Sequence, residues 1–176
     1  KRIRPAEIAV LAQVGRTDVR VFGRPQVAVL PTGNELVDGG FVPGPGKIRN
    51  TNGPMLIACG RQLDADVLDL GIGRDDPQQL RNLIERGLSA DVLVLSGGVS
   101  AGTLDLVPAV LEELKVRQVF HKVSMKPGKP LWFGIAGGNK DDSNDDRSTL
   151  VFGLPGNPVS SFVCFHLFVR PAIRRL

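Results

Sequence analysis

Side chains that commonly bind metal ions or nucleic acids are scarce in this chain. Its 176 residues include two cysteines, two histidines, one tryptophan and no tyrosine. The net charge is +4, but basic residues do not alternate with aromatic ones, so nucleic-acid binding is not expected. Cys59 and Cys164 lack the spacing of a metal-binding motif and are expected to be buried free thiols, which suits the reducing cytoplasm.

A long hydrophobic run is also absent. The longest apolar stretch, residues 159–169, is interrupted by serines and a histidine and is shorter than the roughly 20 residues that span a bilayer. The basic start of the chain is not followed by the apolar run of a secretory signal. We therefore expect a soluble, cytoplasmic protein with no membrane partner. The abrupt start at Lys1 and the uncapped end after Pro171 also lead us to expect a piece of a longer protein.

The composition and the order of apolar segments are those of a globular α/β domain. Hydrophobic residues make up 42% of the chain and charged residues 23%. Strands are expected at residues 26–30, 67–72, 92–95, 116–123, 131–136 and 150–154. Helices are expected at residues 5–14, 53–63, 77–88 and 104–114, and from Pro158 onward. Strands that alternate with helices are typical of a parallel sheet, and the two consecutive strands before residue 137 predict a mixed edge.

Polar and glycine-rich loops follow several of the predicted strands. In open α/β sheets a ligand lies outside the carboxyl ends of the strands. This rule brings segments 32–35, 96–105 and 153–157 together with Asp75 at one edge. Lys126 and Lys129, which share a loop rich in proline and glycine, are expected to reach the same edge and to bind an anion there.

Segment 96–105, with the sequence SGGVSAGTLD, carries the strongest local signal. A glycine-rich turn between a strand and a helix exposes backbone N–H groups that hold phosphates. The segment ends in Asp105, and a carboxylate beside a phosphate indicates a divalent metal ion or a proton-transfer role. An ordinary tight turn, with Asp105 as a helix cap, is the alternative.

The sequence also predicts one long loop and the first residues of two helices. Residues 31–46 contain five glycines and three prolines and are expected to form one long loop. Asn52 is expected to cap the helix at 53–63, and Asp76 with Pro77 is expected to begin the helix at 77–88.

Six segments, taken in order, resemble the molybdopterin molybdenumtransferase family, the MoeA-type enzymes to which the gephyrin E domain also belongs. They are PTGNELV at 31–37, IRNTN at 48–52, GIGRDDP at 71–77, SGGVSAGTLD at 96–105, KVSMKPGKPLWFG at 122–134 and GLPGNPVSSF at 153–162. The resemblance implies the central molybdopterin-binding domain of that family. Its expected fold is a three-layer αβα, MogA-like arrangement with a mostly parallel sheet at residues 23–176, after a lead-in segment at 1–22 from a preceding domain.

The resemblance also implies an activity. The family inserts molybdate into adenylylated molybdopterin, with Mg²⁺-assisted release of AMP. Glu35, Asp75 and Asp105 match acidic residues of the family's site and are the expected catalytic residues and metal ligands. Family members often have aspartate at the position of Asn34. A homodimer of the longer protein and an adenylyltransferase partner are the expected assemblies.

A second set of residues is expected to bind the substrate. It comprises Thr32, Gly33, Ser96, Gly97, Gly98, Ser100, Gly102, Lys126, Lys129, Pro155, Gly156, Asn157 and Pro158. The lysines would bind phosphate or molybdate, the glycines would let the backbone approach the ligand, and the serines would add hydrogen bonds. Neither Ser96 nor Ser100 has an assignable base beside it, so neither is expected to be a nucleophile.

Two rival functions remain open at this point. The same fold serves MogA-type molybdopterin adenylyltransferases, although their glycine loop matches SGGVSAGTLD poorly. A non-catalytic module that binds molybdopterin or scaffolds partners is the other alternative. The choice between molybdenum and tungsten is also open, because the two oxyanions have nearly the same size and charge.

Overall fold

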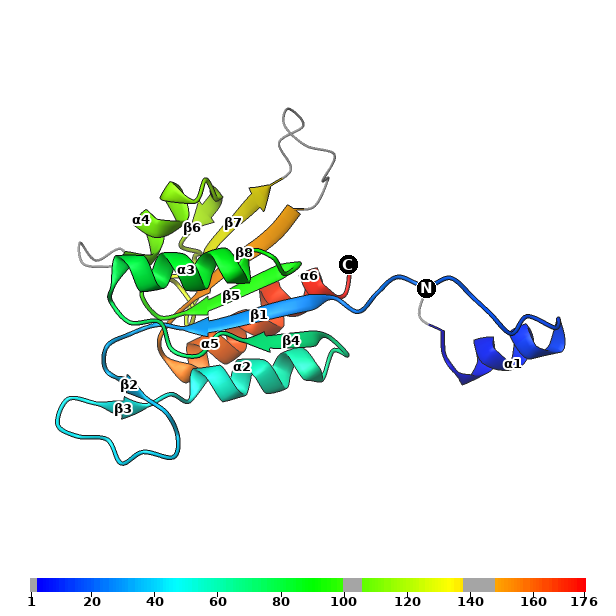
Figure 1. Ribbon diagram of the computed structural model, residues 1–176, viewed down its shortest axis with the longest axis horizontal. Helices are drawn as coiled ribbons and strands as arrows, with labels where there is room; N and C mark the ends of the chain where they lie inside the picture. The colour runs from blue at the N-terminus through cyan, green and yellow to red at the C-terminus, as the bar shows by residue number, and fades with distance from the viewer. Residues whose placement is uncertain (1–2, 100–105, 138–147) are drawn as a thin grey trace.

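The computed structural model describes residues 3–99, 106–137 and 148–176 (Figure 1). The helices are α1 (Pro5–Gln13), α2 (Asn52–Arg61), α3 (Pro77–Gly87), α4 (Leu106–Glu113), α5 (Pro158–Cys164), the π-helical segment η1 (Phe165–Val169) and α6 (Arg170–Ile173). The strands are β1 (Gln26–Pro31), β2 (Leu36–Val37), β3 (Ile48–Arg49), β4 (Asp66–Asp69), β5 (Val92–Ser96), β6 (Arg117–His121), β7 (Trp132–Gly137) and β8 (Ser148–Leu154).

The central sheet has the order β4-β1-β5-β8-β7-β6 within the described residues. Strands β4, β1, β5 and β8 run parallel, whereas β7 is antiparallel to both β8 and β6. The direct connection from β6 to β7 contains no helix, so the chain reverses and pairs with itself, as the two consecutive strands in the sequence predicted. The α/β class and the mixed edge of the sheet are therefore confirmed.

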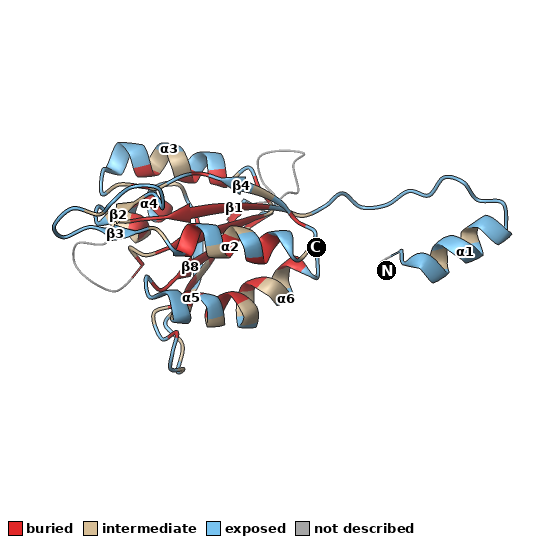
Figure 2. Ribbon diagram, turned by 90° about the horizontal axis from the view of Figure 1, so that it is seen from below, coloured by how far each residue is buried: buried red, intermediate tan, exposed pale blue. Residues whose placement is uncertain are grey.

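Helices cover both faces of the sheet (Figure 2). The sheet therefore separates the hydrophobic core into two parts, one on each face. Val27 and Val29 of β1 point to the face covered by α2 and α5, where Phe165 is fully buried. Ala28 and Leu30 point to the opposite face, which α3 and α4 cover. Successive side chains of a strand alternate between faces, so a strand buried on both faces has a continuous apolar run. The three-layer αβα architecture follows.

The segment between β1 and α2 is more ordered than the sequence predicted. It was expected to be one long loop, but it contains β2, which pairs in parallel with β3. The N–H of Ile48 donates to the carbonyl of Glu35 at 2.8 Å, and the N–H of Asn50 donates to that of Val37 at 2.7 Å. Two-residue strands carry no alternating pattern, which is why the sequence did not reveal them. Their pairing places residues 32–35 next to the start of α2.

The N-terminal segment lies away from the sheet. Helix α1 has no buried residue, and Figures 1 and 2 show it separated from the rest of the chain by an extended stretch. The boundary between a lead-in segment at 1–22 and a domain at 23–176 stays a prediction. None of the helices in the described part of the chain has the length and apolar character that crossing a bilayer requires.

Both cysteines are free and buried, as expected. Burial raises the pKa of the Cys59 and Cys164 thiols above the ordinary thiol value. The native state therefore keeps both protons at an alkaline pH at which the unfolded chain has lost them. Below the ordinary thiol pKa both states keep the thiol protons, so the two states do not differ in the number of protons bound. Above it, the free energy of unfolding falls as the pH rises toward the native pKa.

This pH dependence is directly measurable. We expect urea denaturation at rising alkaline pH to show a loss of stability, and we expect the double variant Cys59→Ala, Cys164→Ala to show a smaller one. The chain contains no tyrosine, which removes one competing titration in this range. Iodoacetamide should modify the thiols slowly in native protein and quickly in urea. Equal alkylation rates in the two states would contradict the assigned burial.

Candidate functional site

The carboxyl ends of three parallel strands lie side by side. Pro31 of β1 is in register with Ser96 of β5, which is in register with Leu154 of β8. Backbone hydrogen bonds continue beyond the carboxyl ends of these strands. The N–H of Thr32 donates to the carbonyl of Ser96 at 2.8 Å. The N–H of Gly97 donates to the carbonyl of Leu154 at 3.1 Å. The loops after all three strands therefore leave the sheet at one edge, where the sequence predicted a ligand site.

The loop after β4 joins the same edge. Gly73 forms a parallel bridge with Thr32, and its N–H donates to the carbonyl of Pro31 at 2.9 Å. The guanidinium of Arg74 donates to the carbonyl of Leu36 at 2.7 Å. Arg74 thus holds two loops together, a role for which the sequence offered no signal beyond its place in GIGRDDP.

These contacts join the loops that carry two of the three predicted carboxylates, Glu35 and Asp75. The N–H of Asp75 donates to the side-chain oxygen of Asn34, the neighbour of Glu35, at 3.2 Å. Both carboxylates are solvent-exposed. The Glu35 carboxylate folds back over Gly33, where a Cβ atom would overlap it and where φ is +143°. Only glycine allows this carboxylate to approach the backbone so closely.

The glycine-rich turn packs against the loop after β1. Gly97 and Gly98 have φ values of +89° and +62°. A Cβ atom on Gly97 would lie 2.6 Å from the carbonyl oxygen of Thr32, and one on Gly98 would lie 2.8 Å from the hydroxyl of Thr32. These glycines were predicted to let the backbone approach a ligand. The structure shows that they first let two loops of the protein approach each other.

Asn52 was expected to be a helix cap, and that prediction is wrong. Thr51 is the N-cap residue of α2, and the Asn50 side chain accepts from the N–H of Gly53 at 2.9 Å. The Asn52 amide nitrogen donates to the hydroxyl of Ser96 at 2.7 Å and to the carbonyl of Gly156 at 2.8 Å. Asn52 therefore ties α2 to the ends of β5 and β8. Asn50, Thr51 and Asn52 are all residue types that favour helix caps, so the choice among them needed the structure.

A buried polar network supports the loop after β8. The hydroxyl oxygens of Ser96 and Ser161 lie 3.3 Å apart, and Ser161 donates to the carbonyl of Pro155. The Asn157 side chain accepts from the N–H groups of Val159 and Ser160 at the start of α5. Asn157, a predicted substrate contact, is therefore a helix cap in this structure, as its residue type favours.

A small cavity of about 70 Å³ lies among these loops. It is lined by Thr32, Glu35, Leu36, Ile48, Arg49, Asn50, Thr51, Asn52, Ser96, Gly97, Gly156 and Pro158. Six of these residues were predicted to belong to the site. The other six come from the segment that holds β2, β3 and the start of α2, where the sequence suggested no site beyond the resemblance of IRNTN.

The lysine loop reaches the same edge of the sheet. β6 and β7 are antiparallel, with His121 opposite Trp132, and Trp132 is opposite Gly153 of β8. The His121 ring nitrogen lies 3.0 Å from the carbonyl oxygen of Val99, which connects this edge to the glycine-rich turn. Lys126 and Lys129 are exposed and do not line the cavity. The structure thus places the lysine loop at the carboxyl edge of the sheet and the two cations outside the cavity.

Three predicted site residues, Ser100, Gly102 and Asp105, lie outside the described residues. Within the ranges 3–99, 106–137 and 148–176, no group of three or more histidine, cysteine, aspartate or glutamate residues is arranged to hold a metal ion. Glu35 and Asp75 are the described members of the predicted carboxylate set. Their loops share an edge, and a metal ion held by them would complete its shell with phosphate oxygens and water.

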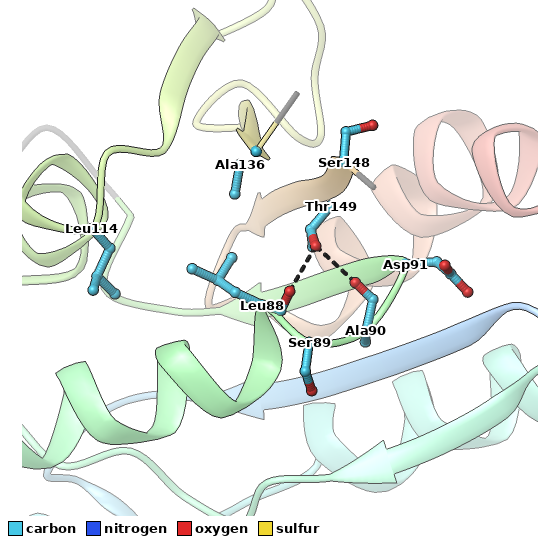
Figure 3. A pocket seen from close by; sticks show the side chains of 9 residues that line it. Leu88, Ser89, Ala90, Asp91, Leu114, Ala136, Ser148 and Thr149 are labelled. Atoms are coloured by element: carbon cyan, nitrogen blue, oxygen red, sulfur yellow. Dashed lines mark hydrogen bonds between the residues drawn. The ribbon is translucent and has the colours of Figure 1, made fainter. Parts of the chain in front are cut away.

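A larger hollow, of about 420 Å³, lies at the opposite edge of the sheet (Figure 3). It is lined by Leu88, Ser89, Ala90, Asp91, Leu114, Ala136, Gly137, Ser148 and Thr149. The Thr149 hydroxyl lies 2.8 Å from the carbonyl oxygens of both Leu88 and Ala90. This hollow contains none of the predicted site residues, and the polar group at its centre is already paired. The smaller cavity at the carboxyl edge, which gathers six of the predicted residues, stays the candidate site.

Fold and site together define an α/β domain with a ligand edge at the carboxyl ends of its parallel strands. Residues 28–175 match the family described as "Probable molybdopterin binding domain", and the chain belongs to this family. The match spans β1 to α6, so it includes every loop of the candidate site.

Curated relatives carry the name molybdopterin molybdenumtransferase. The protein of that name from Staphylococcus aureus strain Mu50 is 37% identical over 175 residues, which cover 99% of this chain and 39% of that protein. The one from Staphylococcus epidermidis strain ATCC 12228 is 36% identical over 176 residues, covering 99% and 40%. The chain therefore spans about two fifths of the length of these relatives.

Solved structures of a molybdopterin biosynthesis protein and of a tungsten cofactor synthesizing protein are also similar to this chain. The molybdopterin biosynthesis moea protein from Pyrococcus horikosii matches with a TM-score of 0.80 at 37% identity, covering 99% of this chain and 41% of that one. The tungsten cofactor synthesizing protein MoaB from Pyrococcus furiosus matches with a TM-score of 0.63 at 16% identity, covering 88% of this chain and 96% of that one. The second match shows a shared fold and the MogA-like architecture, and no more.

Proposed function

We propose that this chain is the molybdopterin-binding domain of a molybdopterin molybdenumtransferase. In this proposal the site at the carboxyl edge acts in the insertion of molybdate into adenylylated molybdopterin, with release of AMP. One observation carries the proposal: Glu35 and Asp75 lie on loops bound to each other at the carboxyl edge, beside the turns of Gly97 and Gly156. The relatives' printed name supports the choice of reaction.

The backbone of the turns and the lysine side chains at this edge would have different roles in binding the substrate. The turns after β5 and β8 present backbone close to the cavity, and Lys126 and Lys129 stand outside it as exposed cations. The lysines would attract the oxyanions, which are the phosphate of the adenylate and the incoming molybdate. A proline follows each of the two lysines and restricts the backbone of the loop, so less freedom is lost when an anion binds.

Mg²⁺ fits the donor chemistry of this edge. It prefers carboxylate oxygens together with phosphate oxygens and water. Glu35 and Asp75, with Asp105 as the third expected ligand, would hold it. When bound, the ion would withdraw charge from the phosphate oxygens as AMP departs. The protein's own contribution is to hold the two loops that carry the carboxylates together, through the hydrogen bond from the Asp75 N–H to the Asn34 side chain.

The longer protein is expected to work as a homodimer and to receive its substrate from an adenylyltransferase partner. Both expectations come from the resemblance. A dimer would supply residues from other domains to the exposed edge.

The test is an AMP-release assay on the full-length protein with adenylylated molybdopterin, molybdate and Mg²⁺. We expect AMP release that depends on molybdate and on Mg²⁺, and no consumption of ATP. Formation of adenylylated molybdopterin from ATP would instead assign the adenylyltransferase reaction. Binding of molybdopterin without turnover under any of these conditions would assign a binding or scaffold module. Either result would overturn the proposal.

A further inference from the structure

The lysine loop continues the hairpin that β6 and β7 form. The N–H of Lys122 donates to the carbonyl of Leu131 at 2.7 Å, and the N–H of Val123 donates to that of Lys129 at 3.0 Å. These two bonds extend the pairing of the strands beyond His121, the last residue of β6. The position of the cations in the loop therefore follows from the position of the hairpin.

Among the residues that the structure describes, one hydrogen bond joins this hairpin to the glycine-rich turn. The Nε2 atom of His121 lies 3.0 Å from the carbonyl oxygen of Val99. A carbonyl oxygen can only accept, so Nε2 carries the hydrogen and donates it. Nε2 carries a hydrogen in the cationic imidazole and in one of the two neutral tautomers, so this bond does not require a charged ring.

Packing holds Val99, the acceptor of this bond, in place. Its side chain is 1% exposed, and its Cγ1 atom lies 2.7 Å from the position that a Cβ atom on Gly153 of β8 would take. Trp132 is opposite both Gly153 and His121 in the sheet, and it belongs with Val99 to the core on the face covered by α3 and α4. Directly opposite residues of antiparallel strands share a face. His121 therefore ties the hairpin to a fixed point on this face.

The other side of the lysine loop has a weaker polar attachment. The Cys164 sulfur of α5 lies 3.8 Å from the carbonyl oxygen of Gly128, and a thiol is a weak donor. Gly128 has a φ of +113°, and a Cβ atom there would lie 2.7 Å from the Cys164 sulfur. The loop thus rests on α5 by close packing. The bond from His121 is the stronger polar link, and it alone leads to the glycine-rich turn within the described residues.

We infer that His121 is a positioning residue that keeps the lysine loop and the glycine-rich turn in one arrangement. This inference rests on the proposed function, in which both segments act on the same substrate. His121 acts through the Val99 carbonyl on one side and through the hairpin on the other, without contact with the substrate. A displacement of about 1 Å in groups that hold a reacting substrate can cost about 10²-fold in rate, so a link of this kind raises the rate without a chemical step of its own.

Two amides of different length test the hydrogen bond. In His121→Gln the side-chain nitrogen is as many bonds from the backbone as Nε2 and can still donate to Val99, whereas in His121→Asn it is one bond closer to the backbone and cannot reach. In the full-length protein, His121→Asn should lower kcat for AMP release about tenfold with little change in KM, and His121→Gln should stay within about threefold of wild type. His166→Asn is the matched control, because His166 is on η1 and outside the site. It should leave kcat unchanged.

The pH profile separates positioning from proton transfer. Glutamine cannot exchange a proton in this range, so a role for His121 as a general acid or base would remove one limb of the profile in His121→Gln. We expect the profile of His121→Gln to overlay that of wild type.

A double-mutant cycle shows whether His121 acts through the lysine loop. If it does, His121→Asn should lower kcat less in a Lys129→Ala background than in wild type, because the cation that it displaces is already missing. Melting temperatures establish that each variant is folded. If His121→Asn is not, His121→Leu, which also lacks a donor, takes its place in the cycle.

The possible failures are distinguishable. Wild-type kcat in His121→Asn would overturn the inference and leave the proposed function intact. Equal losses in His121→Gln and His121→Asn, a changed pH profile in His121→Gln, or fully additive effects with Lys129→Ala would also overturn it. If the wild-type protein releases no AMP, the proposed function is overturned, and the inference fails with it.

Discussion

Replacing Gly97 with alanine should destabilise the protein more than any other single methyl group added at this edge. The new Cβ would lie 2.6 Å from the backbone carbonyl oxygen of Thr32, which cannot move without breaking the bond from the Thr32 N–H to Ser96. The φ of +89° adds conformational strain. Strain and overpacking each cost about 1–3 kcal/mol, so the free energy of unfolding should fall by about 2–6 kcal/mol.

Gly71→Ala is the matched control for this prediction. Gly71 has a φ of +78° but no atom within 4 Å of a Cβ position, so its substitution introduces the strain without the clash. Urea denaturation of both variants, extrapolated to water, separates the two effects. The Gly97 variant should also bind molybdopterin more weakly, because the turn that lines the cavity has moved. Equal losses of stability in the two variants would show that the contact with Thr32 is unimportant.

Neutralising Glu35 or Asp75, the two described carboxylates of the predicted site, should have the largest effect on activity. In the full-length protein, Glu35→Gln and Asp75→Asn should each lower the rate of AMP release on the order of 10²-fold, as expected when one fixed electrostatic contact to a reacting group is lost. Both side chains are exposed, so the free energy of unfolding should change by only about 0.5 kcal/mol. A higher Mg²⁺ requirement in either variant would identify that carboxylate as a metal ligand.

Glu112→Gln provides the control for the loss of one negative charge. Glu112 is exposed on α4 and belongs to neither the cavity nor the predicted site. Its substitution should leave AMP release at the wild-type rate. Wild-type rates in both Glu35→Gln and Asp75→Asn would remove these residues from the mechanism and leave Asp105 as the sole acidic candidate.

Much of the fold was predictable because its signals are local. The apolar run QVAVLP is continuous, since β1 is buried on both faces, and that pattern identifies a central parallel strand in sequence. Asp76 accepts from the N–H of Gln79, and Pro77 begins α3, as their residue types predicted. Each of these features depends on neighbours a few residues apart, so the sequence alone contains the information.

The members of the site were only partly predictable. Residues at the ends of parallel strands follow from topology, because parallel strands end at one edge, and this rule located Thr32, Ser96 and Gly156. Arg74 and Asn52 did not follow from it. Arg74 acts through carbonyl groups 38 to 41 residues away, and Asn52 acts through groups 44 and 104 residues away.

The sequence by itself determined the class of fold and the edge of the sheet at which the predicted loops meet. The tertiary structure alone decided that Thr51 is the N-cap residue of α2, that the Asn50 side chain accepts from the first turn of that helix, and that Asn52 joins three elements. The reason is physical. Secondary structure follows from propensity and periodicity over short windows, whereas the pairing of a buried polar atom depends on distant segments that only folding brings within hydrogen-bond distance.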